Sequence, residues 1–464
     1  MSLLIKNGRV VTATEDTVAD VLCEGETIAA VGQGLSAPDG ASVVDAAGKF
    51  VFPGFIDPHV HIHLPFMGTH AKDTYDSGSR AALVGGTTSL IEMVCPGRDE
   101  DPVEAYELWK SKAAGVSACD YAFHMGVTRF DESTPAALKK IVEDGTASFK
   151  VFLAYKGALG VDDDELYQTL KLASELGVIV TAHCENESLV ARLQAKLLAE
   201  GKTGPEWHEP SRPVQVETEG VQHLMTFAEL TGAHVYVVHT SCKGAVYAAV
   251  EAKLRGVNAW VETVIPYLLL DDTAAHKPDF EGAKYVMSPP IRAARHQPFL
   301  WDALRSRVVS TVATDHAPFD FAGQKEMGRD DFTKIPNGIP SVEHRVRLLY
   351  THGVATGKID LNTFVDAAST QAAKLFGLFP RKGTIAPGAD ADLVVYDPAA
   401  RETLSAETHL MDTDYDAFEG WEVEGRCDLV TVRGEVMVEA GQFVGQLGHG
   451  RFLRREPTHH AAGN

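Results

Sequence analysis

The stretch VFPGFIDPHVHIH, residues 51–63, passes from a nearly continuous apolar segment into a series of histidines. Continuous apolar runs are typical of strands in a parallel sheet that is buried on both faces. His59 and His61 stand two positions apart, so on a strand both imidazoles project to the same side. Two convergent imidazoles are a common beginning of a divalent-metal site. The stretch therefore predicts a buried strand whose carboxyl end delivers metal ligands.

Seven further apolar runs follow this strand, separated by segments with helical periodicity. The runs are residues 87–94, 121–127, 148–154, 178–185, 234–241, 258–264 and 308–316. Eight strands that alternate with helices are typical of an α/β protein with a (β/α)8 TIM-type barrel. We expect this barrel to span residues 53–380.

The two ends of the chain have a different character from the middle. Residues 1–52 and 381–464 are rich in short strands, as in LLIKNGRVV, where an Asn-Gly turn signal lies between apolar runs. From about Gly448 the sequence is polar, and we expect a solvated tail. The alternative is that Arg451, Arg454 and Arg455 contact another subunit.

Composition excludes several classes of partner. Across 464 residues, 42 Lys and Arg stand against 64 Asp and Glu, a formal charge of −22. That charge disfavours nucleic acid and anionic membrane surfaces. The six cysteines are scattered without a CxxC spacing, as in reduced cytosolic proteins. The first residues lack a signal-peptide pattern, and no run reaches the length of a membrane span. We therefore expect a cytoplasmic globular protein with no nucleic-acid or membrane partner.

Polar residues gather at the carboxyl ends of the expected barrel strands, where barrels of this type carry their active sites. Each has an ordinary alternative: a lone strand-end histidine is commonly structural, a lone lysine is commonly exposed, and an Asp-His pair is a possible helix cap. Together they are hard to explain by packing, and they predict a metal centre. The residues are His59, His61, Lys150, His183, His239 and Asp315.

Lys150 needs a separate chemical account, because a protonated ammonium has no lone pair and cannot bind metal. Its neighbours Phe149, Val151 and Phe152 should lower its pKa and free the amine. Addition of carbon dioxide would then give a carbamate, whose two oxygens can bridge two metal ions.

At this point the chain resembles the cyclic amidohydrolases, most closely the D-hydantoinase/dihydropyrimidinase branch. The similarity runs in order over essentially the whole chain. The matching stretches include GFIDPHVHIHLPF, SFKVFLAYKG, TAHCENE, GKTGPEWHEPSRP, VVHTSCK, YVMSPPIR, ATDHAPFD and FTKIPNGIPSVEHRV. The resemblance implies a (β/α)8 barrel with a smaller β-sandwich domain made from both chain ends.

The resemblance also implies a site with two divalent metal ions, usually Zn2+ and sometimes Mn2+ or Co2+. One ion would be held by His59, His61, N6-carboxylated Lys150 and Asp315. The other would be held by Lys150, His183 and His239. The family further suggests a homotetramer.

The same resemblance assigns the catalytic groups. Asp315 would take a proton from the attacking water and return it to the departing ring nitrogen. The phenol of Tyr155 would stabilise the oxyanion, the alternative being a packing aromatic. Backbone groups of Ser288 and Asn337 would pair with the ring amide of a small cyclic ureide.

The residues after the second histidine bear on the substrate. Relatives that resemble dihydroorotases carry an Arg two positions after it to pair with a carboxylate, whereas this chain has His63. Three apolar residues, Leu64, Phe152 and Leu159, are expected to form the pocket for the exocyclic substituent, or else to be ordinary loop anchors. The prediction is a D-selective hydantoinase that forms N-carbamoyl-D-amino acids from 5-substituted hydantoins.

Two alternatives remain open at this stage. One is a dihydropyrimidinase that acts mainly on dihydrouracil and dihydrothymine. The other is a non-catalytic dihydropyrimidinase-like scaffold protein, which the complete set of ligand positions disfavours.

Overall fold

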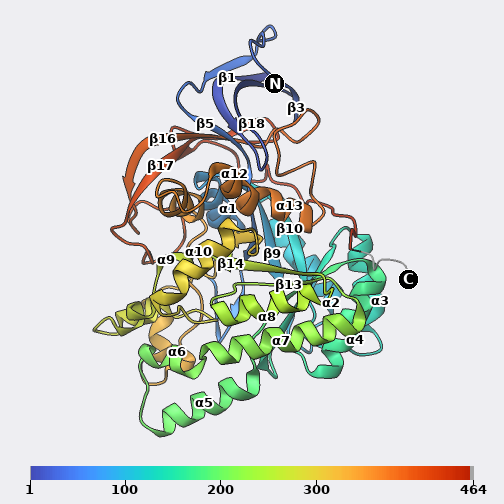
Figure 1. Ribbon diagram of the computed structural model, residues 1–464, viewed down its shortest axis with the longest axis vertical. Coiled ribbons are helices and arrows are strands. Elements are labelled where there is room, and N and C mark those ends of the chain that lie inside the picture. The colour runs from blue at the N-terminus through green and yellow to red at the C-terminus, as the bar shows by residue number, and fades with distance from the viewer. Residues whose placement is uncertain (1, 460–464) are drawn as a thin grey trace.

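The structure is a computed structural model that describes residues 2–459. An eight-stranded parallel barrel ringed by helices lies below a smaller domain of β-structure. Figure 1 shows the N-terminus in this upper domain and the C-terminus beside the barrel. The predicted fold class is therefore confirmed. No helix within residues 2–459 is both long and apolar enough to cross a membrane.

The barrel strands follow one another in chain order around the sheet. They are β6 (Phe55–Val60), β9 (Thr87–Val94), β10 (Asp120–Gly126), β11 (Ser148–Lys156), β12 (Ile179–His183), β13 (Val235–Val237), β14 (Ala259–Val264) and β15 (Thr311–Ala313). The barrel closes between its first and last strands, because the Asp315 N–H donates to the His59 carbonyl (3.0 Å) and the His61 N–H to the His316 carbonyl (2.8 Å). This closure brings His59, His61 and Asp315 to one place.

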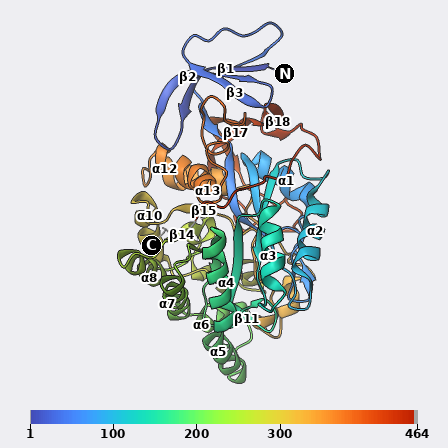
Figure 2. The same ribbon diagram turned by 90° about the vertical axis from the view of Figure 1, so that its right-hand side faces the viewer.

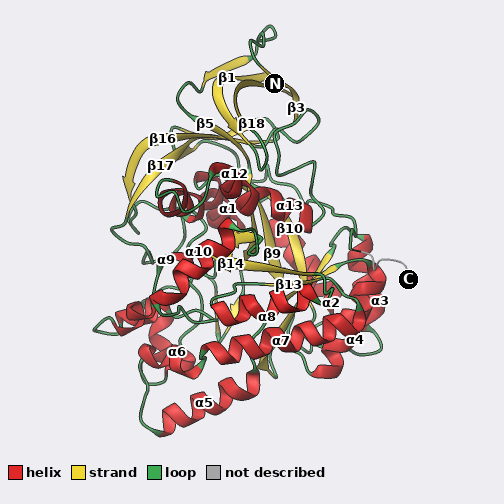
Figure 3. Ribbon diagram, in the orientation of Figure 1, coloured by secondary structure: helices red, strands yellow, loops and turns green. Residues whose placement is uncertain are grey.

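The helices cover the outside of the barrel (Figure 3). They are α1 (Tyr75–Val84), α2 (Pro102–Ala113), α3 (Thr134–Glu143), α4 (Asp163–Leu176), α5 (Glu187–Ala199), α6 (His208–Ser211), α7 (Val214–Thr231), α8 (Lys243–Leu254), α9 (Ile265–Leu269), α10 (Gln297–Arg305), α11 (Arg345–Leu349), α12 (Leu361–Val365) and α13 (Gln371–Leu375). Figure 2 shows α2, α3 and α4 standing side by side along one flank.

Local sequence explains where a typical barrel helix begins and ends. Asp162 caps α4 by accepting the backbone N–H of Glu165, and the Glu165 side chain bonds back to the cap. Such a reciprocal capping box satisfies two donors that a helix start would leave unpaired. Gly177 ends the helix in the left-handed conformation (φ 67°), which glycine adopts without steric cost.

The smaller domain is a single nine-stranded, mostly antiparallel sheet. Its strands are β1 (Ser2–Val11), β2 (Asp16–Glu24), β3 (Thr27–Gly32), β4 (Ser42–Asp45), β5 (Phe50–Pro53), β16 (Leu393–Thr403), β17 (Glu422–Val432), β18 (Glu435–Glu439) and β19 (Gln442–Phe443). The two chain ends join where β5 pairs antiparallel with β16. Side chains from both ends, such as Ile5, Val21 and Val395, share one buried core.

The C-terminal segment does not behave as the expected solvated tail. It lies against the amino-terminal ends of the barrel strands, with Tyr121 N–H bonded to the Arg451 carbonyl (3.0 Å) and Leu453 N–H to the Tyr121 carbonyl (2.7 Å). Arg455 is buried, and Arg451 pairs with Glu26 of the same chain at 2.6 Å. The expectation was wrong because these arginines find backbone and carboxylate partners that lie far away in the sequence.

Candidate metal centre and active site

The six predicted ligand residues meet at the carboxyl ends of the barrel strands. His59 Nε2 and His61 Nε2 each lie 3.2 Å from the same oxygen, Oδ1 of Asp315. On the other side, His183 Nδ1 lies 3.0 Å from His239 Nε2. The rings of His59 and His239 are 5.3 Å apart, so the two groups adjoin.

Lys150 is fully buried beside these histidines, and its Nζ has no hydrogen-bond partner among the described residues. Burial lowers the pKa of Lys150, although Asp315 opposes that shift. The amine lies 4.7 Å from the centre of the Phe152 ring. A lowered pKa leaves the amine free to react, which carbamate formation requires.

Buried partners fix the orientation of the histidines. Glu262 Oε1 accepts the backbone N–H of His239 (2.8 Å) and lies 2.7 Å from His59 Nδ1. We assign Nδ1 as the donor of that pair, the tautomer that leaves Nε2 able to bind metal. The Nε2 lone pair of His59 then faces the Asp315 carboxylate. Two electron-rich groups placed at that distance are stabilised by a cation between them.

His183 is held in the same manner from the opposite side. Its Nε2 lies 2.8 Å from Glu185 Oε2, and Arg212 Nη1 lies 2.5 Å from the same oxygen. Burial alone would raise the pKa of Glu185, but Arg212 and His183 lower it to about 2. Burial also lowers the pKa values of His59, His183 and His239, which keeps the imidazoles neutral and able to bind metal.

The residues therefore fit divalent metal. Four polar atoms of the cluster are buried without a hydrogen-bond partner in the described chain: His59 Nε2, His61 Nδ1, Lys150 Nζ and His239 Nδ1. Buried polar atoms are rarely left in this state unless they have a function. A second group of carboxylates, Asp120, Asp390 and Asp392, does not fit, because Lys382 Nζ already lies 2.6–3.0 Å from all three.

A small cavity of about 40 Å3 opens beside this cluster, and every predicted site residue except His59 lines it. Leu64, Phe152 and Leu159, the residues expected to contact the exocyclic substituent, form an apolar wall of this cavity. The sequence-based prediction missed three further lining residues, Phe66, Cys95 and Ala317. His63 does not line the cavity, and its ring packs 5.8 Å from that of Tyr75.

Tyr155, Ser288 and Asn337 form the polar wall of the cavity. The Tyr155 hydroxyl contacts the Asn337 and Ser288 side chains, and burial raises the pKa of this phenol. Asn337 Nδ2 donates to Ser288 Oγ at 2.9 Å. The backbone N–H and C=O groups of Ser288 and Asn337 have no partner within residues 2–459. Such free groups can pair with the donor and acceptor of a ring amide.

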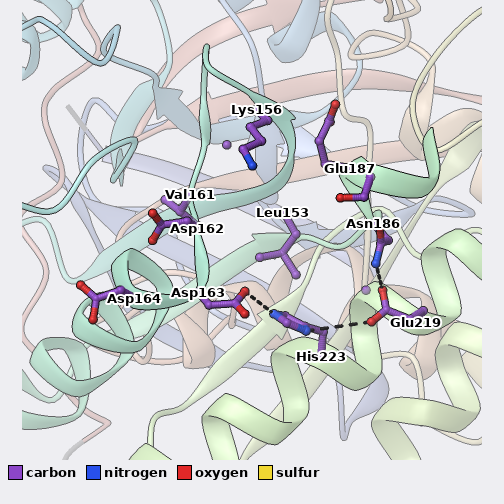
Figure 4. A pocket seen from close by; sticks show the side chains of 13 residues that line it. Leu153, Lys156, Val161, Asp162, Asp163, Asp164, Asn186, Glu187, Glu219 and His223 are labelled. Carbon is purple, nitrogen blue, oxygen red and sulfur yellow. Dashed lines mark hydrogen bonds and ion pairs between the residues drawn. The ribbon is translucent and has the colours of Figure 1, made fainter. Parts of the chain in front are cut away.

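A larger cavity, about 490 Å3, lies beside β11 and is lined by Leu153, Lys156 and residues of α4 and α7 (Figure 4). Its carboxylates are largely engaged: His223 lies 3.0 Å from Asp163 and 3.9 Å from Glu219, and Glu187 accepts the Tyr155 N–H at 2.6 Å. None of the predicted site residues lines this cavity. We therefore place the active site in the smaller one.

The supporting residues Glu262, Glu185 and Arg212 were not predicted from the sequence. Glu262 gave a usable signal, because it is a lone charged residue inside the apolar run AWVETV and is fully buried. Glu185 directly follows the predicted ligand segment. Arg212 gave no signal, since its burial depends on a contact with a residue 27 positions away.

Comparison with known proteins agrees with the fold. The model of the amidohydrolase family matches residues 50–437, and the chain belongs to that family. The similar proteins within that family are named as D-hydantoinases and dihydropyrimidinases. A solved structure from Thermus sp., named D-Hydantoinase (Dihydropyrimidinase), is 62% identical with a TM-score of 0.97, and the match covers 98% of this chain and 100% of that one.

Two curated relatives match over nearly the same length. The D-hydantoinase of Geobacillus stearothermophilus is 48% identical, over 98% of this chain and 97% of its own. The dihydropyrimidinase of Rattus norvegicus is 40% identical, over 98% of this chain and 89% of its own.

Proposed function

We propose that this protein is a metal-dependent hydrolase that opens the cyclic amide bond of 5-substituted hydantoins, dihydropyrimidines or both, and releases N-carbamoyl amino acids. One observation carries the proposal. The histidine cluster and buried Lys150 lie beneath a cavity whose polar wall offers unpaired backbone groups at Ser288 and Asn337. The amidohydrolase family and the hydantoinase relatives support the same reaction class.

Two divalent ions suit the donor set, with Zn2+ as the leading candidate and Mn2+ and Co2+ as the others. His59, His61, N6-carboxylated Lys150 and Asp315 would hold one, and Lys150, His183 and His239 the other. When bound, such ions lower the pKa of a water molecule and polarise the ring carbonyl.

The chain's own residues supply the remaining chemistry. Asp315 is the base, because its Oδ1 lies at the centre of the cluster and its carboxylate lines the cavity. It holds the proton taken from water and returns it to the ring nitrogen as the C–N bond breaks. The Tyr155 hydroxyl, raised in pKa and therefore protonated, donates to the developing oxyanion.

The apolar wall formed by Leu64, Phe152 and Leu159 would select the hand of the substrate. One enantiomer places its 5-substituent against this wall, and the other directs it at the histidines. We propose D-selectivity with graded preference for substituent size, since a methylene in such a pocket is worth about 1–3 kcal/mol.

The test is a rate comparison with metal-loaded protein. We expect hydrolysis of D-5-benzylhydantoin to exceed that of its L-enantiomer, and the ratio to fall in Leu64→Ala and Phe152→Ala. Equal rates for both enantiomers would contradict the selective role proposed for the apolar wall. No turnover of hydantoins, dihydrouracil, dihydroorotate or allantoin would refute the enzyme and favour a scaffold protein.

A dihydropyrimidinase is the second candidate function, supported by the rat relative and by a ring amide common to both substrates. A higher kcat/KM for dihydrouracil than for hydantoins would favour it. We further propose a cytoplasmic homotetramer, and domains that divide at 52/53 and at 380/381. Light scattering of the purified protein would measure the oligomeric state.

A further inference from the structure

Lys325 is a buried cation without a carboxylate partner in the described chain. It lies on the short 3-10 helix Lys325–Gly328 and is fully buried. Its Nζ donates to three backbone carbonyls, those of Val286 (2.9 Å), Pro336 (2.6 Å) and Gly338 (2.7 Å). An ammonium has three N–H donors, so these carbonyls satisfy it completely.

Burying a cation among carbonyls, without a carboxylate, costs free energy. Burial lowers the pKa of Lys325. The three hydrogen bonds from Nζ to carbonyls favour the charged form, because only an ammonium has three N–H donors. A structural lysine elsewhere in the chain is paired differently. Lys382 is equally buried but lies within 3.0 Å of three carboxylates.

The three carbonyls belong to the two segments that present Ser288 and Asn337 to the cavity. Val286 precedes Ser288 by two residues, and Pro336 and Gly338 flank Asn337. The Pro336 carbonyl and the Asn337 N–H are parts of one planar peptide unit. A cation bonded to that carbonyl fixes the direction of the N–H and polarises it toward donation.

His208 makes the matching contact behind Ser288. Its Nε2 lies 2.8 Å from the Met287 carbonyl, which shares a peptide unit with the Ser288 N–H. Burial lowers the pKa of His208 to about 3, so the imidazole is neutral and Nε2 carries the hydrogen that it donates to the carbonyl. His208 belongs to the stretch GKTGPEWHEPSRP, which the catalytic residues leave unexplained.

We propose that Lys325 and His208 are positioning residues for the ring-amide site, holding the backbone N–H groups of Asn337 and Ser288 in register with the substrate. The pair acts as a brace on the side of these loops away from the cavity. The inference rests on the proposed function, because it is the ureide ring that these groups would recognise. It predicts that loss of the brace weakens substrate binding more than it slows the chemical step.

The experiment uses the metal-loaded enzyme and two variants of buried lysines. Lys325→Met removes all three donors with little change of shape, and Lys382→Met removes a buried lysine far from the cavity as a control. We expect KM for 5-benzylhydantoin to rise about tenfold or more in Lys325→Met, the size expected for lost hydrogen bonds to a charged group. The fall in kcat should be smaller, metal content should stay at the wild-type level, and KM should not change in Lys382→Met.

His208→Leu and His208→Gln test the contact of His208 with the Met287 carbonyl. They also keep the proposal testable if Lys325→Met does not fold. Leu removes the donor, whereas Gln offers an amide N–H. We expect KM to rise in His208→Leu and to return toward the wild-type value in His208→Gln. A similar KM in wild type, Lys325→Met and His208→Leu would overturn the brace.

Amide hydrogen exchange tests the positioning role without substrate, and therefore independently of the proposed function. We expect faster amide exchange in residues 286–290 and 335–339 of Lys325→Met than in wild type or Lys382→Met. If wild-type enzyme hydrolyses no cyclic ureide, the proposed function fails, and unchanged exchange in these segments would still overturn the brace. Turnover by wild type with unchanged KM in the variants would overturn the brace alone.

Discussion

Glu262 offers the sharpest test of how the protein prepares its metal site. Its carboxylate accepts three donors: the His239 backbone N–H, the His59 ring N–H and the Tyr236 hydroxyl (2.8 Å). In Glu262→Ala, Tyr236 keeps its contact with Thr311, but the other two donors lose their partner. His59 is then free to rotate its Nε2 away from Asp315.

The magnitude follows from these contacts. Two buried donors left unpaired cost about 1–3 kcal/mol each, so the free energy of unfolding should fall by about 2–6 kcal/mol. Loss of a group that orients a metal-binding histidine lowers metal affinity about 10- to 100-fold. Glu262→Gln should lose less of both, because its amide oxygen can still accept from His59 and His239.

The assay is competitive chelation for metal affinity, with thermal unfolding of the metal-free protein measured in parallel. Glu217→Gln is the control, since Glu217 is a buried carboxylate that bonds Arg292 and Ser241 and contacts none of the predicted ligands. Wild-type metal affinity in Glu262→Ala would refute the role assigned to this carboxylate, whatever the loss of stability.

Three further outcomes are expected. Lys150→Ala should lose most bound metal and nearly all turnover, and mass spectrometry of the intact wild-type protein under native conditions should show a carbon dioxide adduct; full metal occupancy beside an unmodified lysine would contradict this. Asp315→Asn should lose about 10²–10⁴-fold in rate while the site at His183 and His239 stays filled, and near-normal turnover would mean that another group is the base. Because the folded-state pKa of Glu185 is depressed from 4.5 to about 2, its pairing stabilises the protein above pH 4.5, by about 3 kcal/mol, and this contribution disappears as the pH falls toward 2. Glu185→Gln should flatten the dependence of unfolding free energy on pH in that acidic interval, and an unchanged slope would show that the pair contributes no pH-dependent stability.

The barrel, and the meeting of its candidate ligand residues at one rim, could be predicted because most strands carry their signal locally. An apolar run that ends in His or Asp gives both the strand and the position of its last side chain at the rim. Lys150 is instead the third residue of β11 and stands out as a charged residue inside an apolar run. The parallel order of the strands then places those side chains together. The expectation for Leu64, Phe152 and Leu159 rested instead on the family resemblance and on their place in two loops at this rim, and all three line one cavity.

The supporting residues could not be predicted in this way. Lys325 lies in the polar stretch AGQKEMG, which is typical of an exposed loop, and its burial depends on carbonyls 11 to 39 residues away. Arg455 likewise stands in a polar segment, yet it is buried, with its N–H bonded to the Gly145 carbonyl (2.8 Å). Contacts of this range are determined by the complete fold and leave no periodic trace in the sequence.

The C-terminal segment affects how the chain matures on the ribosome. Gly448 and Arg455 bond to carbonyls at residues 116 and 145, and Phe452 stacks on Phe123 at 5.7 Å. Domains usually fold from the amino terminus as synthesis proceeds. Here residues 116–145 of the barrel contact a segment that is translated more than 300 residues later. The native contacts that Phe123 and Tyr121 of β10 make with the C-terminal segment therefore cannot form until translation is almost finished.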